Sequence, residues 1–146
     1  MVDSGIFSKL PSKLLSNDGE VSTSDVLSSS LIGVYFSAHW CPPCRGFTPV
    51  LADCFTEWKN ESKSIQIIFV SSDRDEDEFK NYFKEMPWVA VPFNDKNTIK
   101  EFKTHFNVTG IPKFVVLDNK GNIIDSDART SVAKNNVVSI DAWTKK

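Results

Sequence analysis

Residues 31–45 read LIGVYFSAHWCPPCR, and the architecture of the chain follows from this stretch. Residues 31–37 form a short apolar run, which is typical of a strand buried on both faces of a sheet. A C-x-x-C pair, Cys41 and Cys44, follows at once. Apolar side chains then recur at helical spacing, at Phe47, Val50, Leu51, Cys54, Phe55 and Trp58. The stretch therefore predicts a strand that ends in a dithiol at the start of a helix.

Strand and helix patterns alternate through the rest of the chain. Residues 65–71 are a second buried strand, residues 88–91 are a short extended segment, and residues 113–118 and 122–125 flank a hairpin turn. Two further helical stripes are Phe79, Tyr82, Phe83 and Met86, and Ile99, Phe102 and Phe106. This order predicts an α/β fold with three layers, in which helices cover both faces of a central mixed sheet.

The chain has the size of one domain, and we expect a single domain over residues 1–146. Residues 1–30 are an N-terminal extension with a small hairpin around Asn17-Asp18-Gly19. The tail from Ser131 is expected to be a helical end that Ile140 and Trp143 anchor.

The 146 residues are 40% hydrophobic and carry a net charge of −2, which excludes intrinsic disorder and argues against nucleic-acid binding. The longest apolar run, Leu31 to Phe36, is too short to cross a bilayer, and the chain starts without a signal-peptide pattern. We therefore expect a monomeric protein of the cytoplasm, with the nucleus as a second location, that binds neither nucleic acid nor membrane.

Cys41 and Cys44 predict redox chemistry at the first turn of the helix. Unpaired N–H groups and the positive end of the helix dipole favour a thiolate at Cys41, and a thiolate is the attacking species in disulfide exchange. Cys44, one turn further in, is expected to be shielded and to resolve the mixed disulfide. Pro42 and Pro43 stiffen the loop, and neither needs a hydrogen-bond partner there.

The alternative interpretation of the C-x-x-C motif is that it supplies two of the four ligands of a zinc site. Structural zinc requires four ligands, and the remaining candidates are Cys54, His39 and His105. Because the chain has no second C-x-x-C and no H-x₃₋₅-H, we favour redox chemistry and expect no metal. Cys54 lies on the apolar stripe and is expected to be an inert core thiol.

Trp40-Cys-Pro-Pro-Cys-Arg resembles the thioredoxin superfamily, and the agreement continues at Ile111-Pro112, just before the strand at residues 113–118. The resemblance implies that Pro112 is cis and faces the dithiol. Residues 36–49 and 82–93, with Ala128-Arg129, resemble the tryparedoxin and nucleoredoxin branch more closely, and Ser72 before Asp73-Arg74 resembles nucleoredoxin.

The resemblance also suggests which residues flank a substrate groove, namely Trp40, Asp73, Ile111, Pro112 and Arg129. Asp73 with Glu76 also fits a capping box at the start of a helix. For Asp73 we favour this helix-capping role over a contact with the substrate. For Arg129 two interpretations are nearly even. It is either a surface arginine without a role in binding or a group that binds the carboxylate of a glutathione-type thiol. The buried aspartate of ordinary thioredoxins is replaced by Tyr35, so proton transfer must rely on water or another group.

Two functions from different classes follow. The first is a thiol–disulfide oxidoreductase that reduces protein disulfides through Cys41 as nucleophile and Cys44 as resolving thiol. Its partners are disulfide-containing proteins such as peroxidases, its electron donor is a glutathione-type thiol, another low-molecular-weight dithiol or a flavin reductase, and it binds no cofactor. The second is a redox-gated interaction module with little turnover. A disulfide isomerase or oxidase is disfavoured by the missing secretory signal.

Overall fold

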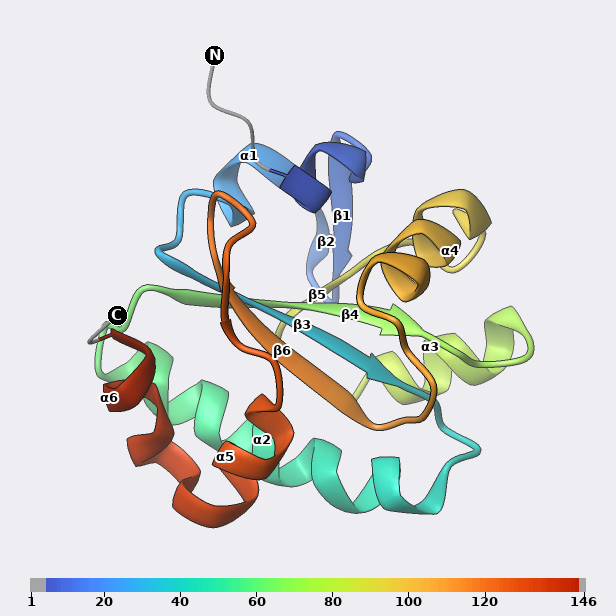
Figure 1. The fold of residues 1–146 in the computed structure, drawn as a ribbon. Coiled ribbons are helices and arrows are strands. Elements are labelled where there is room, and N and C mark those ends of the chain that lie inside the picture. The colour runs from blue at the N-terminus through green and yellow to red at the C-terminus, as the bar shows by residue number, and fades with distance from the viewer. Residues whose placement is uncertain (1–4, 145–146) are drawn as a thin grey trace.

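The computed structural model describes residues 5–144, which form a seven-stranded sheet with helices on both faces (Figure 1). The elements in chain order are η1 (Gly5–Lys9), β1 (Lys13–Ser16), β2 (Gly19–Ser22), α1 (Thr23–Val26), β3 (Leu31–Ser37), α2 (Pro42–Asn60), β4 (Ile65–Ser71), α3 (Glu76–Phe83), β5 (Val89–Ala90), α4 (Lys96–His105), β6 (Lys113–Asp118), β7 (Ile123–Asp125), α5 (Ala128–Asn135), η2 (Asn136–Val138) and α6 (Ser139–Thr144). The expected α/β architecture with a mixed sheet is confirmed.

Strand β3 lies inside the sheet and pairs differently on its two sides. The strand order is β2-β1-β5-β4-β3-β6-β7. β3 runs parallel to β4, from Leu31 opposite Ile65 to Ser37 opposite Ser71, and antiparallel to β6. β5 is parallel to β4, whereas β1 joins β5 in the antiparallel sense. The end of β3 is therefore next to the end of β4 and the beginning of β6.

Two hydrophobic cores lie on opposite faces of the sheet, and β3 contributes to both because its side chains alternate in direction. Leu31 and Tyr35 belong to the core beneath α2, α3, α5 and α6. Ile32, Val34 and Phe36 belong to the core that η1, α1 and α4 cover. In Figure 1, α2, α5 and α6 lie below the sheet and α4 lies above it. All seven residues of β3 are buried, as the apolar run predicts.

The expected apolar stripe of α2 is buried with one exception. Its buried residues include Cys44, Phe47, Leu51, Cys54, Phe55 and Trp58, whereas Val50 is 37% exposed. The stripe of α3 also faces the core, and this helix ends at Phe83, before the expected stop at Pro87.

Both ends of the described chain join the main fold. The expected N-terminal hairpin is formed by β1 and β2, and it extends the sheet rather than standing apart from it. At the other end, Ile140 and Trp143 are each 2% exposed, so the tail is anchored as predicted. Residues 1–4 and 145–146 of the expected domain lie outside the described residues.

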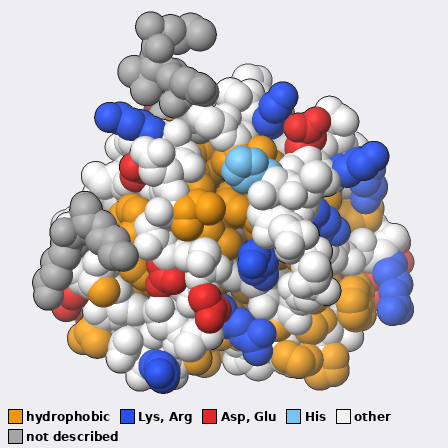
Figure 2. Space-filling model, in the orientation of Figure 1, with side chains coloured by type: hydrophobic (Ala, Val, Ile, Leu, Met, Phe, Trp, Pro, Cys, Tyr) orange, Lys and Arg blue, Asp and Glu red, His pale blue; other side chains and the backbone are white. Residues whose placement is uncertain are grey.

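Charged side chains are dispersed over the face that Figure 2 shows. Lysine and arginine side chains alternate there with acidic and uncharged ones and do not gather into one basic patch. None of the helices in residues 5–144 has the length and apolar composition that a bilayer crossing requires.

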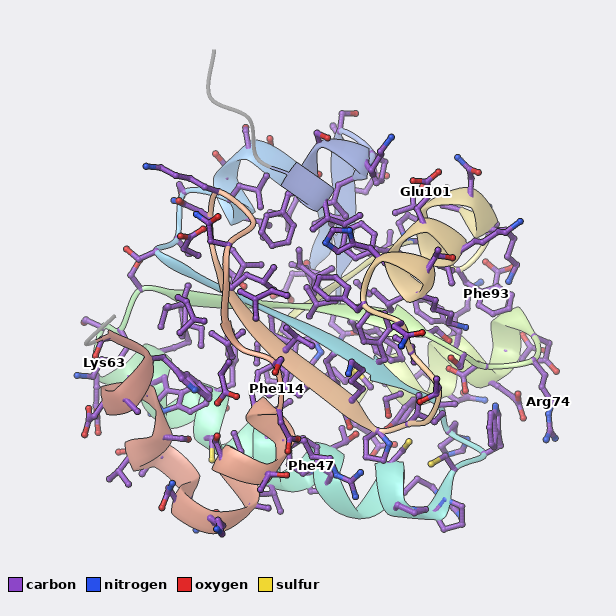
Figure 3. All side chains as sticks on the ribbon, in the orientation of Figure 1. Phe47, Lys63, Arg74, Phe93, Glu101 and Phe114 are labelled. Atoms are coloured by element: carbon purple, nitrogen blue, oxygen red, sulfur yellow. The ribbon has the colours of Figure 1, made fainter. Side chains whose placement is uncertain are left out.

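Gly33 in β3 is required by the close approach of Phe114 from β6. A Cβ atom at position 33 would lie 2.4 Å from Phe114 Cε1 and 2.8 Å from Phe114 Cζ. Phe114 is fully buried and lies between β6 and α5 (Figure 3), so the ring has no room to withdraw. The missing side chain of Gly33 therefore makes space for one of the large rings of the core.

We predict that Gly33→Ala lowers the free energy of unfolding by about 1–3 kcal/mol, because the added methyl group overpacks the core. The matched control is Gly46→Ala in α2, where a Cβ atom meets nothing within 4 Å. That control should stabilise the protein by about 0.5–1 kcal/mol, as alanine favours the helix. Urea denaturation of both variants checks the prediction, and equal unfolding midpoints would contradict it.

Candidate active site

The dithiol lies where strand β3 ends and helix α2 begins. β3 ends at Ser37 and α2 starts at Pro42, with Cys41 as the N-cap residue in an extended conformation (φ −97°, ψ 111°). The carboxyl edge of parallel strands is the usual location of functional sites in open α/β folds. Cys41 and Cys44 therefore lie at the edge of the sheet that the sequence predicts, and both are free thiols in this structure.

The Cys41 sulfur accepts the first free N–H group of the helix. Pro42 and Pro43 occupy the first two helical positions and have no N–H to donate. The N–H of Cys44 donates to Cys41 Sγ at 3.4 Å, and the N–H of Arg45 donates to the Cys41 carbonyl at 3.1 Å. Because N–H groups at a helix N-terminus favour negative charge, this geometry suits a thiolate at Cys41.

The second thiol is in a different environment. Cys44 has no exposed surface, and burial, with the hydrogen bond to Cys41, raises the pKa of its thiol to about 11. Hydrogen bonds to the Ser37 side chain and the Ala38 backbone act in the opposite direction. Cys44 is therefore a neutral thiol near pH 7, which fits the expectation of a shielded second thiol.

The loop before β6 closes over the dithiol from the side. The Ile111–Pro112 peptide bond is cis, as the resemblance implies, and Pro112 is buried. The Ile111 carbonyl oxygen lies 3.8 Å from Cys41 Sγ, and the Ile111 side chain packs against Ala38, Cys41 and Cys44. A residue 70 positions away from Cys41 thus becomes its neighbour through the pairing of β6 with β3.

A groove continues from this loop to helix α5. Its volume is about 610 Å³, and its lining includes Ile111, Pro112, Asp127, Arg129 and Lys134. The Arg129 side chain is exposed, and its Nη1 donates to the Pro112 carbonyl at 3.2 Å. Arg129 is therefore attached to the loop that faces the dithiol.

Asp73 does not cap helix α3, so the capping reading is wrong. The N-cap is Asp75, whose side chain accepts the Glu78 N–H. The Asp73 carboxylate is instead buried, and it accepts the His39 N–H at 2.6 Å and the Ser71 hydroxyl at 2.6 Å. Burial raises the pKa of the Asp73 carboxyl. Asp73 thereby ties the end of β4 to the segment just before Cys41.

Trp40 presents an aromatic surface next to the dithiol. Its side chain is 40% exposed, and its Nε1–H donates to the Ser72 carbonyl at 2.9 Å. The guanidinium of Arg74 lies 5.0 Å from the Trp40 ring, at the edge of the molecule where Figure 3 labels Arg74. The indole is thus held in place on one side and open to solvent on another.

A chain of buried hydroxyl groups behind Cys44 escaped the sequence analysis. Ser37 Oγ lies 2.6 Å from Tyr82 Oη, Tyr82 Oη contacts Thr48 Oγ1, and Tyr35 Oη lies 2.6 Å from Thr48 Oγ1. All four side chains are at most 2% exposed. The available signal was the hydroxyl group of Tyr35, Ser37 and Tyr82 at positions that the patterns place in the core, whereas Thr48 lies on no predicted stripe. Tyr82, for example, was interpreted only as part of an apolar stripe.

The other candidate metal ligands are scattered. Within residues 5–144 no three or more His, Cys, Asp or Glu side chains come together as a metal site. Cys54 belongs to the large core beneath the sheet, whereas Cys41 and Cys44 form their own small cluster with Ala38.

Comparisons with known proteins agree with this geometry. A family described as thioredoxin-like matches residues 29–123. The chain is 42% identical to a tryparedoxin of Trypanosoma brucei brucei over 132 residues, which cover 88% of this chain and 90% of that protein. It is 45% identical to mouse nucleoredoxin over 119 residues, which cover 82% of this chain but 27% of nucleoredoxin. The chain thus spans about a quarter of the length of the nucleoredoxins it matches.

Solved tryparedoxin structures share the fold. Native tryparedoxin I from Crithidia fasciculata superposes with a TM-score of 0.84 at 39% identity, covering 90% of this chain and 92% of that one. Tryparedoxin II in complex with glutathionylspermidine superposes with a TM-score of 0.83 at 34% identity, again covering 90% and 92% of the two chains.

We predict that the reduced protein loses stability from about pH 9 to pH 11 more steeply than the oxidised protein. The folded state raises the pKa of Cys44 from its ordinary value of 9.0 to about 11, so it favours the neutral thiol. The resulting stabilisation is complete below pH 9 and is lost as the pH rises through 11. In the disulfide form Cys44 has no proton to lose, whereas the buried tyrosines and Cys54 titrate in both forms.

Urea denaturation of both forms at several pH values between 8 and 11.5 measures this difference. The gap in unfolding free energy between the reduced and oxidised forms should change over that range. A gap that stays constant with pH would show that Cys44 has the same pKa in the folded and unfolded chains.

Proposed function

The chain belongs to the thioredoxin-like family, whose tryparedoxin and nucleoredoxin members are thiol oxidoreductases, and we propose that it reduces protein disulfides by dithiol–disulfide exchange. The Cys41 thiolate attacks one sulfur of the substrate disulfide, and the other sulfur leaves as a thiolate. Cys44 then attacks Cys41 Sγ, which releases the second substrate sulfur. Two electrons pass to the substrate, and the Cys41–Cys44 disulfide forms.

One observation carries this proposal: the two sulfurs stand in unequal positions on the same helical turn. Cys41 is 5% exposed and its Sγ accepts the Cys44 N–H at the end of the helix, whereas Cys44 has no exposed surface and burial raises the pKa of its thiol to about 11. An attacking thiol needs stabilised negative charge, and a resolving thiol needs to stay unreactive until the mixed disulfide forms. These requirements support the assignment of Cys41 as the attacking thiol and Cys44 as the resolving thiol.

The surroundings of the dithiol supply positioning and substrate contacts. We assign Trp40 and Ile111 to the substrate surface, because Trp40 is exposed and the Ile111 carbonyl lies 3.8 Å from Cys41 Sγ. Pro42 and Pro43 leave the Cys44 N–H as the first donor of the helix. Asp73, with both carboxylate oxygens hydrogen-bonded, acts through the His39 segment as a positioning residue.

An external thiol must return the disulfide to the dithiol, and the groove beside Pro112 suits a glutathione-type donor. Lys113, Arg129 and Lys134 line this groove together with one acidic residue, Asp127, and arginine binds carboxylates well. A tryparedoxin II of similar fold was solved in complex with glutathionylspermidine, a thiol of this class. Disulfide-containing proteins such as peroxidases are the proposed recipients of the electrons.

The second candidate is a redox-gated interaction module, which the 45% identity to nucleoredoxin favours. In that case the dithiol state would control partner binding, and turnover would be incidental. Steady insulin reduction with a thiol donor supports the enzyme. Partner capture that requires oxidation, without turnover, supports the module.

We predict that Cys44→Ser accumulates mixed disulfides with its substrates, because the second attack is missing. Cys41→Ser should form none, since the attacking sulfur is absent. Non-reducing gels of protein captured from cells, followed by mass spectrometry of the linked peptides, measure both results. Cys54→Ser is the matched control and should behave like the unmodified chain. Equal capture by the Cys41 and Cys44 variants would contradict the assigned roles.

We also predict that Arg129→Gln raises the KM for reduced glutathione, the thiol donor, by about tenfold and changes kcat little. This corresponds to the loss of one charge-assisted hydrogen bond, worth about 1.4 kcal/mol. Lys134→Gln, in the same groove but without the bond to Pro112, should have a smaller effect. Steady-state kinetics compares the two, and an unchanged KM for Arg129→Gln would remove Arg129 from the donor site.

A further inference from the structure

We propose that the buried hydroxyl chain Ser37–Tyr82–Thr48–Tyr35 orients the Ser37 hydroxyl toward Cys44 and so stabilises the Cys44 thiolate during the resolving step. This inference rests on the proposed function, in which Cys44 performs the second attack. It assigns a positioning role to three side chains that do not contact the substrate, and it places Ser37 in contact with a reacting sulfur.

The chain connects three elements of the fold. Ser37 is the last residue of β3, Tyr82 comes from α3, and Thr48 comes from the second turn of α2. The Ser37 hydroxyl lowers the pKa of the buried Cys44 thiol, and Ser37 Oγ lies 2.6 Å from Tyr82 Oη. Thr48 Oγ1 then contacts Tyr82 Oη and lies 2.6 Å from Tyr35 Oη.

No charged group lies within the chain. The side chains that contain its oxygens are 0% exposed for Ser37 and Tyr35, 1% for Tyr82 and 2% for Thr48. Burial raises the pKa values of both tyrosines, so both keep their protons at physiological pH. Every member is therefore a neutral hydroxyl group that donates one hydrogen bond and accepts up to two.

Hydrogen-bond directions along such a chain depend on one another. A Cys44 thiolate can only accept, so Ser37 must donate to it. Ser37 then accepts from Tyr82, Tyr82 accepts from Thr48, and Thr48 accepts from Tyr35. With a neutral Cys44 thiol the directions can reverse, with the S–H group donating to Ser37. In either direction every oxygen of the chain takes part in at least one hydrogen bond.

The chain orients protons but does not take up the proton of Cys44. When Cys44 is deprotonated, its proton passes to solvent, and the departing substrate thiolate takes a proton from solvent in turn. The titratable side chains that interact with Cys44 are Cys41, at the start of the same helix, and Tyr82 from α3. The His39 ring lies 5.4 Å from the Tyr82 ring, which makes His39 the next titratable group outward.

The reaction with 5,5′-dithiobis(2-nitrobenzoate) separates the two attacks, because each releases one coloured thiolate. Attack by Cys41 releases the first, and attack by Cys44 on the mixed disulfide releases the second. We expect Tyr82→Phe to slow the second phase about tenfold at pH 7, equivalent to a rise of about one unit in the Cys44 pKa, and to leave the first phase unchanged. Ser37→Ala should slow the second phase at least as much.

Tyr35→Phe removes only the last donor of the chain and should have a smaller effect than Tyr82→Phe. Thr98→Val is the matched control for removal of a buried hydroxyl, since Thr98 hydrogen-bonds Asp95 and the Lys9 carbonyl instead. It should leave both phases unchanged. Near-UV circular dichroism establishes that each variant is folded, and a ¹³C titration of Cys44 Cβ in a Cys41→Ser background measures the shift directly.

The proposal is overturned if Ser37→Ala and Tyr82→Phe both leave the second phase unchanged, or if they slow the two phases equally. Neither readout needs a protein substrate. A failure of the proposed function would instead appear as missing protein capture by Cys44→Ser alongside a normal two-phase reaction.

Discussion

The hydrogen bond from the Cys44 N–H to Cys41 Sγ is the interaction around which the rest of the structure is arranged. It is an N-cap hydrogen bond, and the two prolines at the first helical positions leave no earlier donor to compete with it. It also requires that helix α2 start close to the end of β3, which ends at Ser37. β3, paired on both sides and buried throughout, fixes that start within the fold. The dithiol thus takes its rigidity from the most constrained strand of the sheet.

The two neighbours of β3 each bring one component to this site. β4 is parallel, so its carboxyl end delivers Asp73 beside the residues that precede Cys41. β6 is antiparallel, so the loop at its beginning delivers Ile111 and Pro112 beside the sulfur. The asymmetry between the two thiols follows from the same arrangement. Cys41 lies at the end of the helix and under the loop, whereas Cys44 faces the interior and its hydroxyl groups.

Sequence patterns were sufficient to predict the helices and strands whose buried side chains recur at regular spacing. The apolar run at residues 31–37 and the stripe from Phe47 to Trp58 predicted β3 and α2, and the hairpin near residue 120 was found as β6 and β7. Val50 was placed on the buried stripe but is 37% exposed. Asp73 fitted a local capping pattern, but its carboxylate binds a backbone N–H 34 residues away, and Asp75 caps the helix instead.

The sequence alone determined where the two sulfurs lie, because a C-x-x-C pair after a buried strand, with prolines between the cysteines, specifies a dithiol at a helix N-terminus. Only the tertiary structure decided what surrounds them. Ser37, Thr48 and Tyr82 lie on three separate elements, and Ile111 is 70 residues from Cys41, so no local spacing relates them. Local periodicity reports which side chains are buried, whereas the contacts between buried polar groups depend on how the strands and helices pack.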